Sequence, residues 1–242
     1  MLVPLDGFRA AVDAFHASGA CGANVTLPFK VDAFEYASEL SVRARQAGAV
    51  NTLKFDGSIV FGDNTDGVGL CRDIVDNLEV ALAGARILVL GAGGAVRGVI
   101  GPLLDAQPEQ ILIANRTPAK ADEIAGMFKN GGTVRSIALS ALAAQQFDIV
   151  INATSASVTG EMPTLPSSCF RPGALAYEMM YGKGLTPFMT LAVNAGVRVS
   201  DGLGMLVEQA AEAFFVWRGI RPATAGVLTE LRAQLQTSLR DE

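Results

Sequence analysis

Lys30 is the first residue whose setting suits proton transfer. It ends the stretch GANVTLPFK, in which every other residue is small, apolar or neutral. Pro28 holds Leu27 extended and cannot donate to a sheet, so the stretch predicts a strand end, a fixed bend and a helix from about Val31. A lysine in this setting either reaches solvent as an ordinary surface residue or takes part in chemistry.

A glycine-rich turn in RILVLGAGGAVRGVI has the character of a phosphate-binding loop. The turn contains Gly91, Ala92, Gly93, Gly94 and Ala95, between an apolar strand and the start of a helix. Glycines allow a tight turn and a close approach to a pyrophosphate, and the helix start offers its N–H groups to that anion. The third glycine of the common pattern is absent, so this is a variant of the dinucleotide fingerprint. A turn that serves only packing is the alternative.

The end of the next predicted strand favours NADP over NAD. Asn115, Arg116 and Thr117 stand there, and Lys120 follows. An NAD site usually has a carboxylate near this point for the ribose 2′-hydroxyl, whereas a guanidinium beside a hydroxyl and an amide suits a 2′-phosphate. The alternative is that Arg116 and Thr117 only begin the next helix.

A later strand ends in small polar residues, in the sequence FDIVINATS. Thr154 and Ser155 follow Asn152 there. Ligands of an open parallel sheet lie off the carboxyl ends of its strands, so these residues are expected to face the cofactor. They could equally form a capped turn.

A reductase that uses a nicotinamide also needs a group that gives or takes a proton. His16 is the only histidine and is expected at the surface of an amphipathic helix, and no tyrosine has a lysine four places later. Lysine or a carboxylate therefore remains. Asp66, in GDNTDGVGL, stands where an extended segment turns into a helix, so the alternative role for it is that of a helix N-cap.

Strands and helices alternate through the middle of the chain, which predicts a parallel sheet with helices on both faces. The predicted strands are 86–90, 110–115, 133–137, 147–152, 174–179 and 197–200, and the predicted helices are 96–104, 119–128, 187–194, 205–218 and 225–239. Upstream, NTLKFDGSIVFG predicts a hairpin that turns at Asp56 and Gly57. Because the upstream part has a hairpin and the middle part has alternating strands and helices, two domains are predicted.

The composition narrows the class of protein. The chain has 242 residues, 50% hydrophobic and 18% charged, with a net charge of −5, which is typical of a globular protein. The sequence has no run of basic residues, so binding to nucleic acid is not expected. No signal peptide and no membrane-spanning apolar run are evident, so a cytoplasmic location is expected. Cys21, Cys71 and Cys169 are widely spaced and are expected to be reduced thiols, with no metal site.

Eight motifs, taken together and in order, resemble those of the shikimate dehydrogenase family. They are GANVTLPFK, AGAVNTL, GDNTDGVGL, GAGGAVRGV, NRT, INATS, YEMMYGKGLTPF and DGLGMLVEQAAEAF, and they extend from about Leu2 to Gly219. The resemblance implies NADP-dependent interconversion of 3-dehydroshikimate and shikimate, in a cleft between a substrate domain and a Rossmann domain. A quinate or broad-specificity relative and a non-catalytic NADP-binding protein are the alternatives.

The resemblance also implies roles for individual residues. Lys30 and Asp66 would be the catalytic pair, in which the ammonium group meets the developing alkoxide and the carboxylate orients it. The implied substrate-binding residues are Asn24, Thr26, Asn51, Tyr181 and Gln209, and those implied near the nicotinamide are Met179, Gly202, Gly204 and Met205.

The expected fold is α/β, with a Rossmann-type doubly wound NADP domain over 67–202 and a smaller α/β substrate domain over 1–66 and 203–242. Three features depart from the family. Its chains begin with a strand and a helix that carry two serines for the substrate carboxylate, and nothing in this sequence matches them. Glu178 also stands where the family more often has aspartate, and Ala156 and Ser157 where a glycine is usual. From the first departure, the chain as written is expected to bind NADP but to convert shikimate poorly. Its state is expected to be monomer or homodimer.

Overall fold

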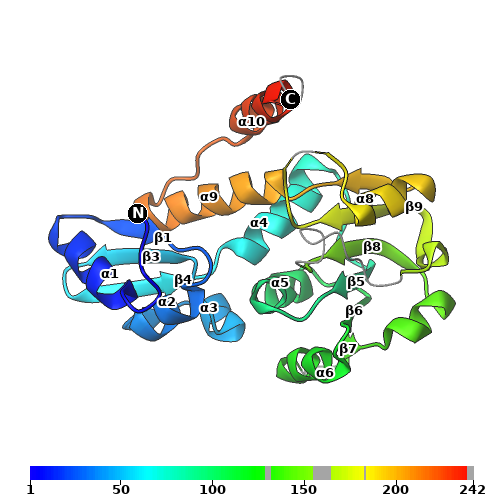
Figure 1. Ribbon diagram of the computed structural model, residues 1–242, viewed down its shortest axis with the longest axis horizontal. Coiled ribbons are helices and arrows are strands. Elements are labelled where there is room, and N and C mark those ends of the chain that lie inside the picture. The colour runs from blue at the N-terminus through cyan, green and yellow to red at the C-terminus, as the bar shows by residue number, and fades with distance from the viewer. Residues whose placement is uncertain (129–131, 155–164, 183, 239–242) are drawn as a thin grey trace.

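The computed structural model describes residues 1–128, 132–154, 165–182 and 184–238. Within these residues the chain forms two β-sheets, one of four strands and one of six (Figure 1). The small sheet lies beside the N-terminus, and long helices connect it to the large sheet.

The small sheet has the order β1-β3-β4-β2, with β1 at Gly22–Asn24, β2 at Glu39–Leu40, β3 at Thr52–Asp56 and β4 at Ile59–Asp63. β3 and β4 form the predicted hairpin, and Gly57 provides the left-handed residue of its turn with φ +59°. Three helices accompany this sheet, α1 (Phe8–Ala17), α2 (Lys30–Tyr36) and α3 (Val42–Ala47). Their apolar residues form one core with the sheet, to which Phe8, Ala33, Val50 and Leu53 belong.

The large sheet is parallel and has the order β10-β9-β8-β5-β6-β7. Its strands are β5 (Arg86–Leu90), β6 (Gln110–Ala114), β7 (Val134–Ser136), β8 (Phe147–Asn152), β9 (Phe170–Glu178) and β10 (Arg198–Ser200). The chain moves outward from β5 to β7 and then returns to add β8 on the other side of β5. The order therefore reverses between β5 and β8, which is where such sheets bind ligands.

Helices cover both faces of the large sheet, as the alternation predicts. α5 (Gly94–Asp105) and α6 (Pro118–Met127) share a core with Ile87 and Val89 of β5. α8 (Pro187–Asn194) packs on the opposite face, over β9 and β10, and shares a core with Leu88 and Leu90 of β5. The predicted class, a mixed α/β fold with a Rossmann-like parallel sheet, is confirmed.

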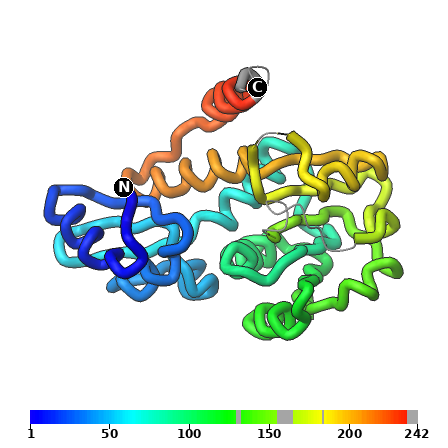
Figure 2. Tube along the Cα trace, in the orientation of Figure 1, coloured from blue at the N-terminus to red at the C-terminus, as the bar shows by residue number. Residues whose placement is uncertain are grey.

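Two helices connect the sheets, as the tube in Figure 2 shows. α4 (Asp66–Arg72) leads from β4 toward the large sheet and ends in a π-helical turn, η1 (Asp73–Asn77), and α9 (Leu203–Arg218) returns toward the small sheet. The two helices touch closely, because a Cβ added at Gly69 would lie 2.7 Å from the backbone nitrogen of Gln209. Trp217 then fixes the far end of α9, since its Nε1 donates to the carbonyl of Leu53 at 2.9 Å. The last helix, α10 (Ala225–Ser238), follows α9.

Most predicted elements are present, and three differences have physical causes. β9 begins at Phe170 rather than at 174, because Pro172 and Gly173 are accommodated where its ladder with β8 shifts register. α5 begins at Gly94, two residues early, since the glycine turn itself enters the helix. Asp66 is the first residue of α4 and Thr65 is its N-cap, so the alternative of a capping role for Asp66 was wrong.

Candidate active site

Lys30 and Asp66 form a direct ion pair. Lys30 Nζ donates to Asp66 Oδ2 at 2.5 Å, and the side chains are 24% and 11% exposed. Each residue is the first of its helix, α2 for Lys30 and α4 for Asp66. The fold therefore brings together two helix starts that lie 36 residues apart in the sequence, and leaves the pair partly open to solvent.

Asn51 joins this pair to helix α9. Its Nδ2 lies 2.8 Å from Asp66 Oδ1 and 3.1 Å from Gln209 Oε1. Its Oδ1 accepts from the backbone nitrogen of Thr65 at 2.9 Å. Asn51 is only 3% exposed, so little water competes for its amide. The bonds to both ends of that amide therefore fix its orientation. Four predicted residues, Lys30, Asn51, Asp66 and Gln209, thus belong to one hydrogen-bonded group.

The other predicted substrate residues differ in their relation to this group. Asn24 supports it directly, because its Nδ2 donates to the carbonyl of Asn51 at 3.3 Å and to Thr52 Oγ1 at 3.1 Å. Thr26 and Tyr181 are exposed, and in the described part of the chain no hydrogen bond ties either side chain to Lys30 or Asp66.

The glycine turn between β5 and α5 is tight and borders open space. Gly91 has φ +113°, and a Cβ there would lie 3.1 Å from the carbonyl oxygen of Ala153, so the turn requires glycine. Gly93 is the N-cap of α5 and makes no side-chain cap bond, and a Cβ at Gly93 or Gly94 would meet nothing within 4 Å. Ala92 is half-buried and Ala95 exposed. The first N–H groups of α5 thus border open space at the point where the strand order reverses, which fits an anionic group.

The residues predicted to hold a 2′-phosphate lie together after β6. Arg116, Thr117 and Lys120 are exposed, and Asn115 Nδ2 donates to the carbonyl of Thr117 at 2.9 Å. Thr117 is also the N-cap residue of α6, followed by Pro118, so it does begin a helix. Arg116 precedes that helix and presents an exposed guanidinium at the carboxyl edge of the sheet.

The end of β8 forms the capped turn given above as the alternative. Asn152 Oδ1 accepts from the Oγ1 of Thr154 at 2.8 Å and from its backbone nitrogen at 3.2 Å. Ser155 lies outside the described residues. Asn152 Nδ2 in turn donates to Glu178 Oε2 at 2.8 Å.

Glu178 organises the loop after β9, a role that the sequence analysis missed. Its carboxylate is fully buried and accepts from Thr186 Oγ1 at 3.0 Å and from the backbone nitrogen of Met180 at 3.2 Å. Thr186 is the N-cap of α8, so Glu178 links two strand ends and a helix start. The only signal in the sequence was its departure from the family motif.

The residues expected near the nicotinamide are closely packed. A Cβ at Gly202 would collide with the carbonyl of Met179, and one at Gly204 would collide with the carboxylate of Asp73. Met205 is 9% exposed and belongs to the core of the large sheet. Both glycines thus permit the start of α9 to pass directly beside β9 and η1.

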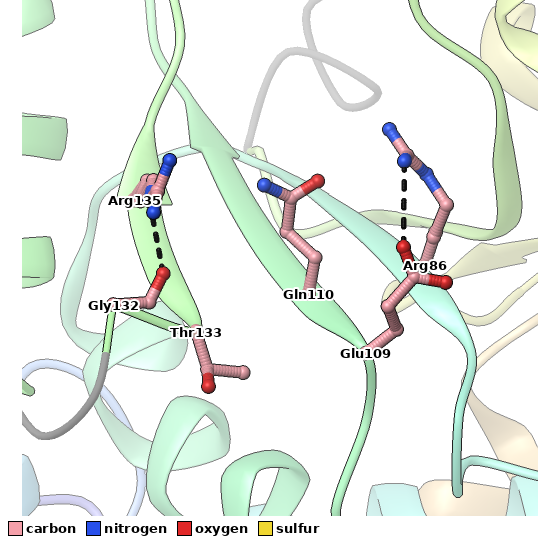
Figure 3. Close-up of a pocket in the computed structure, with 6 residues that line it drawn as sticks. All are labelled: Arg86, Glu109, Gln110, Gly132, Thr133 and Arg135. Atoms are coloured by element: carbon pink, nitrogen blue, oxygen red, sulfur yellow. Dashed lines mark hydrogen bonds and ion pairs between the residues drawn. The ribbon is translucent and has the colours of Figure 1, made fainter.

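A polar pocket of about 320 Å³ lies at the opposite edge of the large sheet (Figure 3). Its lining residues are Arg86, Glu109, Gln110, Gly132, Thr133 and Arg135. They stand at the amino ends of β5, β6 and β7, whereas the glycine turn follows the carboxyl end of β5. The pocket is therefore separate from the candidate site.

The described residues contain no group of three or more side chains that could hold a metal ion. The cysteines are free, and burial raises the pKa of the Cys71 thiol to about 12 and that of Cys169 to about 11. In the part of the chain that the structure describes, no helix is both long and apolar enough to cross a membrane.

Comparison with protein families gives three matches along the chain. The models described as "Shikimate dehydrogenase substrate binding domain", "Shikimate / quinate 5-dehydrogenase" and "Shikimate 5'-dehydrogenase C-terminal domain" match residues 1–53, 72–159 and 202–232.

Individual proteins and structures agree with these matches. A shikimate dehydrogenase (NADP(+)) from Dechloromonas aromatica is 60% identical, over 97% of this chain and 86% of that protein. The crystal structure of an Ael1 enzyme from Pseudomonas putida has a TM-score of 0.91 at 48% identity, covering 96% of this chain and 85% of the other. Shikimate 5-dehydrogenase from Thermus thermophilus, solved with NADP(H) and shikimate, has a TM-score of 0.83 at 31% identity, covering 96% and 85%.

Proposed function

The chain belongs to the shikimate dehydrogenase family, and we propose that it catalyses the NADP-dependent, reversible reduction of 3-dehydroshikimate to shikimate. One observation carries the proposal, the Lys30–Asp66 ion pair at 2.5 Å with Asn51 joining Asp66 to Gln209. The relatives that match most of the chain are NADP-dependent shikimate dehydrogenases, which supports the same conclusion.

The chain's own residues fit NADP. Gly91, Gly93 and Gly94 would admit the pyrophosphate beside the first turn of α5, where open space borders the N–H groups. Arg116, with Thr117 and Lys120, would hold the 2′-phosphate. NADP(H), when bound, supplies or accepts the hydride.

Proton transfer falls to the chain itself. Lys30 Nζ would donate its proton to the substrate carbonyl oxygen as that oxygen gains negative charge, and would take it back in the reverse direction. Asp66 holds the ammonium group in place, and Asn51 holds the second oxygen of Asp66 at 2.8 Å. Gln209 reaches the same group from α9, so it is placed to bind a ring hydroxyl beside the reacting carbon.

We also propose the division into a substrate domain, 1–66 with 203–242, and an NADP domain, 67–202. Separate cores support it, since the apolar residues around the small sheet form a cluster distinct from the two clusters of the large sheet. The substrate would then bind beside Lys30, between the sheets. A cytoplasmic location and a monomeric or homodimeric state complete the proposal.

The test is NADPH oxidation by the purified chain with 3-dehydroshikimate, set beside quinate oxidation with NAD and with NADP. We expect slow turnover of 3-dehydroshikimate with NADPH, in line with the poor conversion expected from the sequence, and little turnover of quinate. Turnover of quinate with NAD would favour the quinate dehydrogenase alternative, for which the "Shikimate / quinate" family description leaves room. NADP binding without any turnover would contradict the proposal and favour a non-catalytic NADP-binding protein.

A further inference from the structure

We propose that Arg43 is a positioning residue for this reaction, whose guanidinium ties the turn that carries Asp66 to the helix that carries Gln209. The inference rests on the proposed function. Arg43 lies on α3 and touches neither Lys30 nor Asp66 by any hydrogen bond in the described chain, so its effect must pass through other residues.

Arg43 first fixes the end of β4. Its Nε donates to Asp63 Oδ1 at 2.7 Å and its Nη2 donates to Asp63 Oδ2 at 2.6 Å, which is the two-pronged geometry that a guanidinium forms with a carboxylate. Ser41 Oγ adds a bond to Asp63 Oδ1 at 2.5 Å. Asp63 is only 3% exposed, so little water is available to replace these partners.

Asp63 then holds the turn that leads to Asp66. Its Oδ1 accepts from the backbone nitrogen of Asn64 at 2.8 Å, and Asn64 Oδ1 accepts from the backbone nitrogen of Asp66 at 3.2 Å. The carbonyl of Asp63 accepts from the backbone nitrogen of Asn51 at 3.0 Å. A displacement of Asp63 would therefore move both Asp66 and the amide that orients it.

The same guanidinium reaches α9. Arg43 Nη2 donates to Glu212 Oε1 at 3.0 Å, and Glu212 lies three residues after Gln209, on the same side of the helix. Arg221 forms an ion pair with Glu212 Oε2 that lacks hydrogen-bond geometry, so this second contact is electrostatic only. Arg43 thus adds a second hydrogen-bonded link between the Asp66 turn and the Gln209 helix, one turn along α9 from the direct bonds of Asn51 and Thr65 to Gln209 Oε1.

The charges in this cluster depend on each other. Burial opposes the ionised form of Asp63, but the hydrogen bonds and charge of Arg43 outweigh it and hold the pKa of Asp63 below its usual range. Burial likewise opposes the charged form of Arg43, while Asp63 and Glu212 raise its pKa. Without Arg43, the buried Asp63 would lose the charge and both hydrogen bonds of its guanidinium partner, and the pKa of Asp63 would rise.

The experiment compares Arg43→Met and Arg43→Lys with a control, Arg45→Met. Arg45 lies on the same helix and is exposed. At pH 7 we expect Arg43→Met to lower kcat about 10- to 100-fold, the scale of a small misplacement of catalytic groups. Its affinity for NADP should stay within about twofold, since the hydrogen bonds and ion pairs of Arg43 in the described chain reach Asp63 and Glu212 and none reaches the glycine turn or Arg116. Arg43→Lys should recover part of kcat, because it keeps the charge but not both bonds.

The pH profile separates positioning from a merely structural role. When kcat of Arg43→Met is plotted against pH, the inflection on the acid side should lie at a pH about one unit or more higher than in wild type. The reason is that Asp63 takes up a proton at higher pH. An unchanged kcat, or a kcat that falls only in proportion to the folded fraction with an unmoved profile, would overturn the proposal. If Arg43→Met does not fold, Glu212→Ala removes the link to α9, together with the ion pair to Arg221, and leaves both bonds from Arg43 to Asp63 in place. We expect this variant to raise the KM for 3-dehydroshikimate with little change in the pH profile. An unchanged KM in Glu212→Ala would equally contradict the link.

A readout independent of turnover keeps this test distinct from that of the proposed function. The backbone N–H groups of Thr65 and Asp66 are bonded to Asn51 Oδ1 and Asn64 Oδ1. Amide hydrogen exchange at these two positions should accelerate about tenfold or more in Arg43→Met and stay unchanged in Arg45→Met. Unchanged exchange would overturn the positioning role, whereas an inactive wild-type chain with this exchange pattern would overturn only the proposed function.

Discussion

Asn51 donates its side-chain amide to Asp66 at 2.8 Å, so the carboxylate that pairs with Lys30 is held on its second oxygen by a neutral donor. The same amide reaches Gln209 on α9. A neutral donor leaves the negative charge of Asp66 in place, and with it the attraction that holds the ammonium group of Lys30.

Asn51→Asp should disturb that arrangement through its charge and through loss of the Nδ2 donor. The variant has the shape of asparagine but places a second carboxylate beside Asp66, and two close carboxylates raise the pKa of one of them. We expect kcat at pH 7 to fall about tenfold or more, with an activity optimum at altered pH. Steady-state kinetics from pH 5 to about 9 would measure it, with the exposed Asn194→Asp as control. A wild-type pH profile would show that Asn51 does not set the charge of the pair.

The glycine turn offers a pair of variants with opposite defects. Gly91→Ala should destabilise the fold, because φ is +113° and the new Cβ would lie 3.1 Å from Ala153. Gly93→Ala should leave stability unchanged within about 0.5 kcal/mol, since its Cβ would meet no protein atom, yet weaken NADP binding by occupying the space for the pyrophosphate. Urea unfolding and calorimetric titration with NADP measure the two effects. Normal NADP affinity in Gly93→Ala would remove the turn from the cofactor site.

Arg116→Ala should distinguish the two nicotinamide cofactors. Loss of a bond to a charged phosphate weakens NADP binding by about 1.5 to 3 kcal/mol, whereas NAD has no group there to lose. Calorimetry with both nucleotides measures the difference, and Arg135→Ala, at the other edge of the sheet, is the control. Equal losses for NADP and NAD would mean that Arg116 serves the structure.

Asp73 should make stability depend on pH. Burial raises its pKa above the usual range, against hydrogen bonds from Tyr177 at 2.6 Å and Asn77 at 2.9 Å. A raised carboxyl pKa stabilises the fold fully below the unfolded value of about 3.9, and this contribution is lost as the pH rises through the folded pKa.

The free energy of unfolding of wild type minus that of Asp73→Asn should therefore decrease from about pH 4 upward. Urea unfolding at a series of pH values measures this difference. Asp76→Asn, an exposed change in the same π-helical turn, should show no such trend. A difference that stays constant with pH would contradict the raised pKa.

The fold could be predicted largely because its signals are local. Strand and helix periods, the hairpin turn at Gly57 and the glycine turn after β5 each depend on a few neighbouring residues. The start of β9 was harder to predict, because Pro172 and Gly173 are residues that usually interrupt a strand. In the structure they are tolerated where the pairing of β9 with β8 shifts register.

Some residues of the candidate site could be predicted from the sequence and others could not. The motifs indicated Lys30, Asp66, Asn51 and Gln209, which the structure joins through hydrogen bonds. Arg43 could not be found, because its partners lie far away in the sequence, and Glu178 differed only as a departure from the family motif. Arg43 and Glu212 are 169 residues apart, and only folding brings them within 3.0 Å.

The central claim is that Lys30 transfers the proton, and paired measurements on Lys30→Ala test it most directly. The control is Lys54→Ala, a half-buried lysine on β3 of the same sheet. With 3-dehydroshikimate and NADPH, Lys30→Ala should lose about 10²- to 10⁴-fold in kcat, while its calorimetric affinity for NADP stays within about twofold of wild type. A variant that keeps more than half of the wild-type kcat would contradict the account.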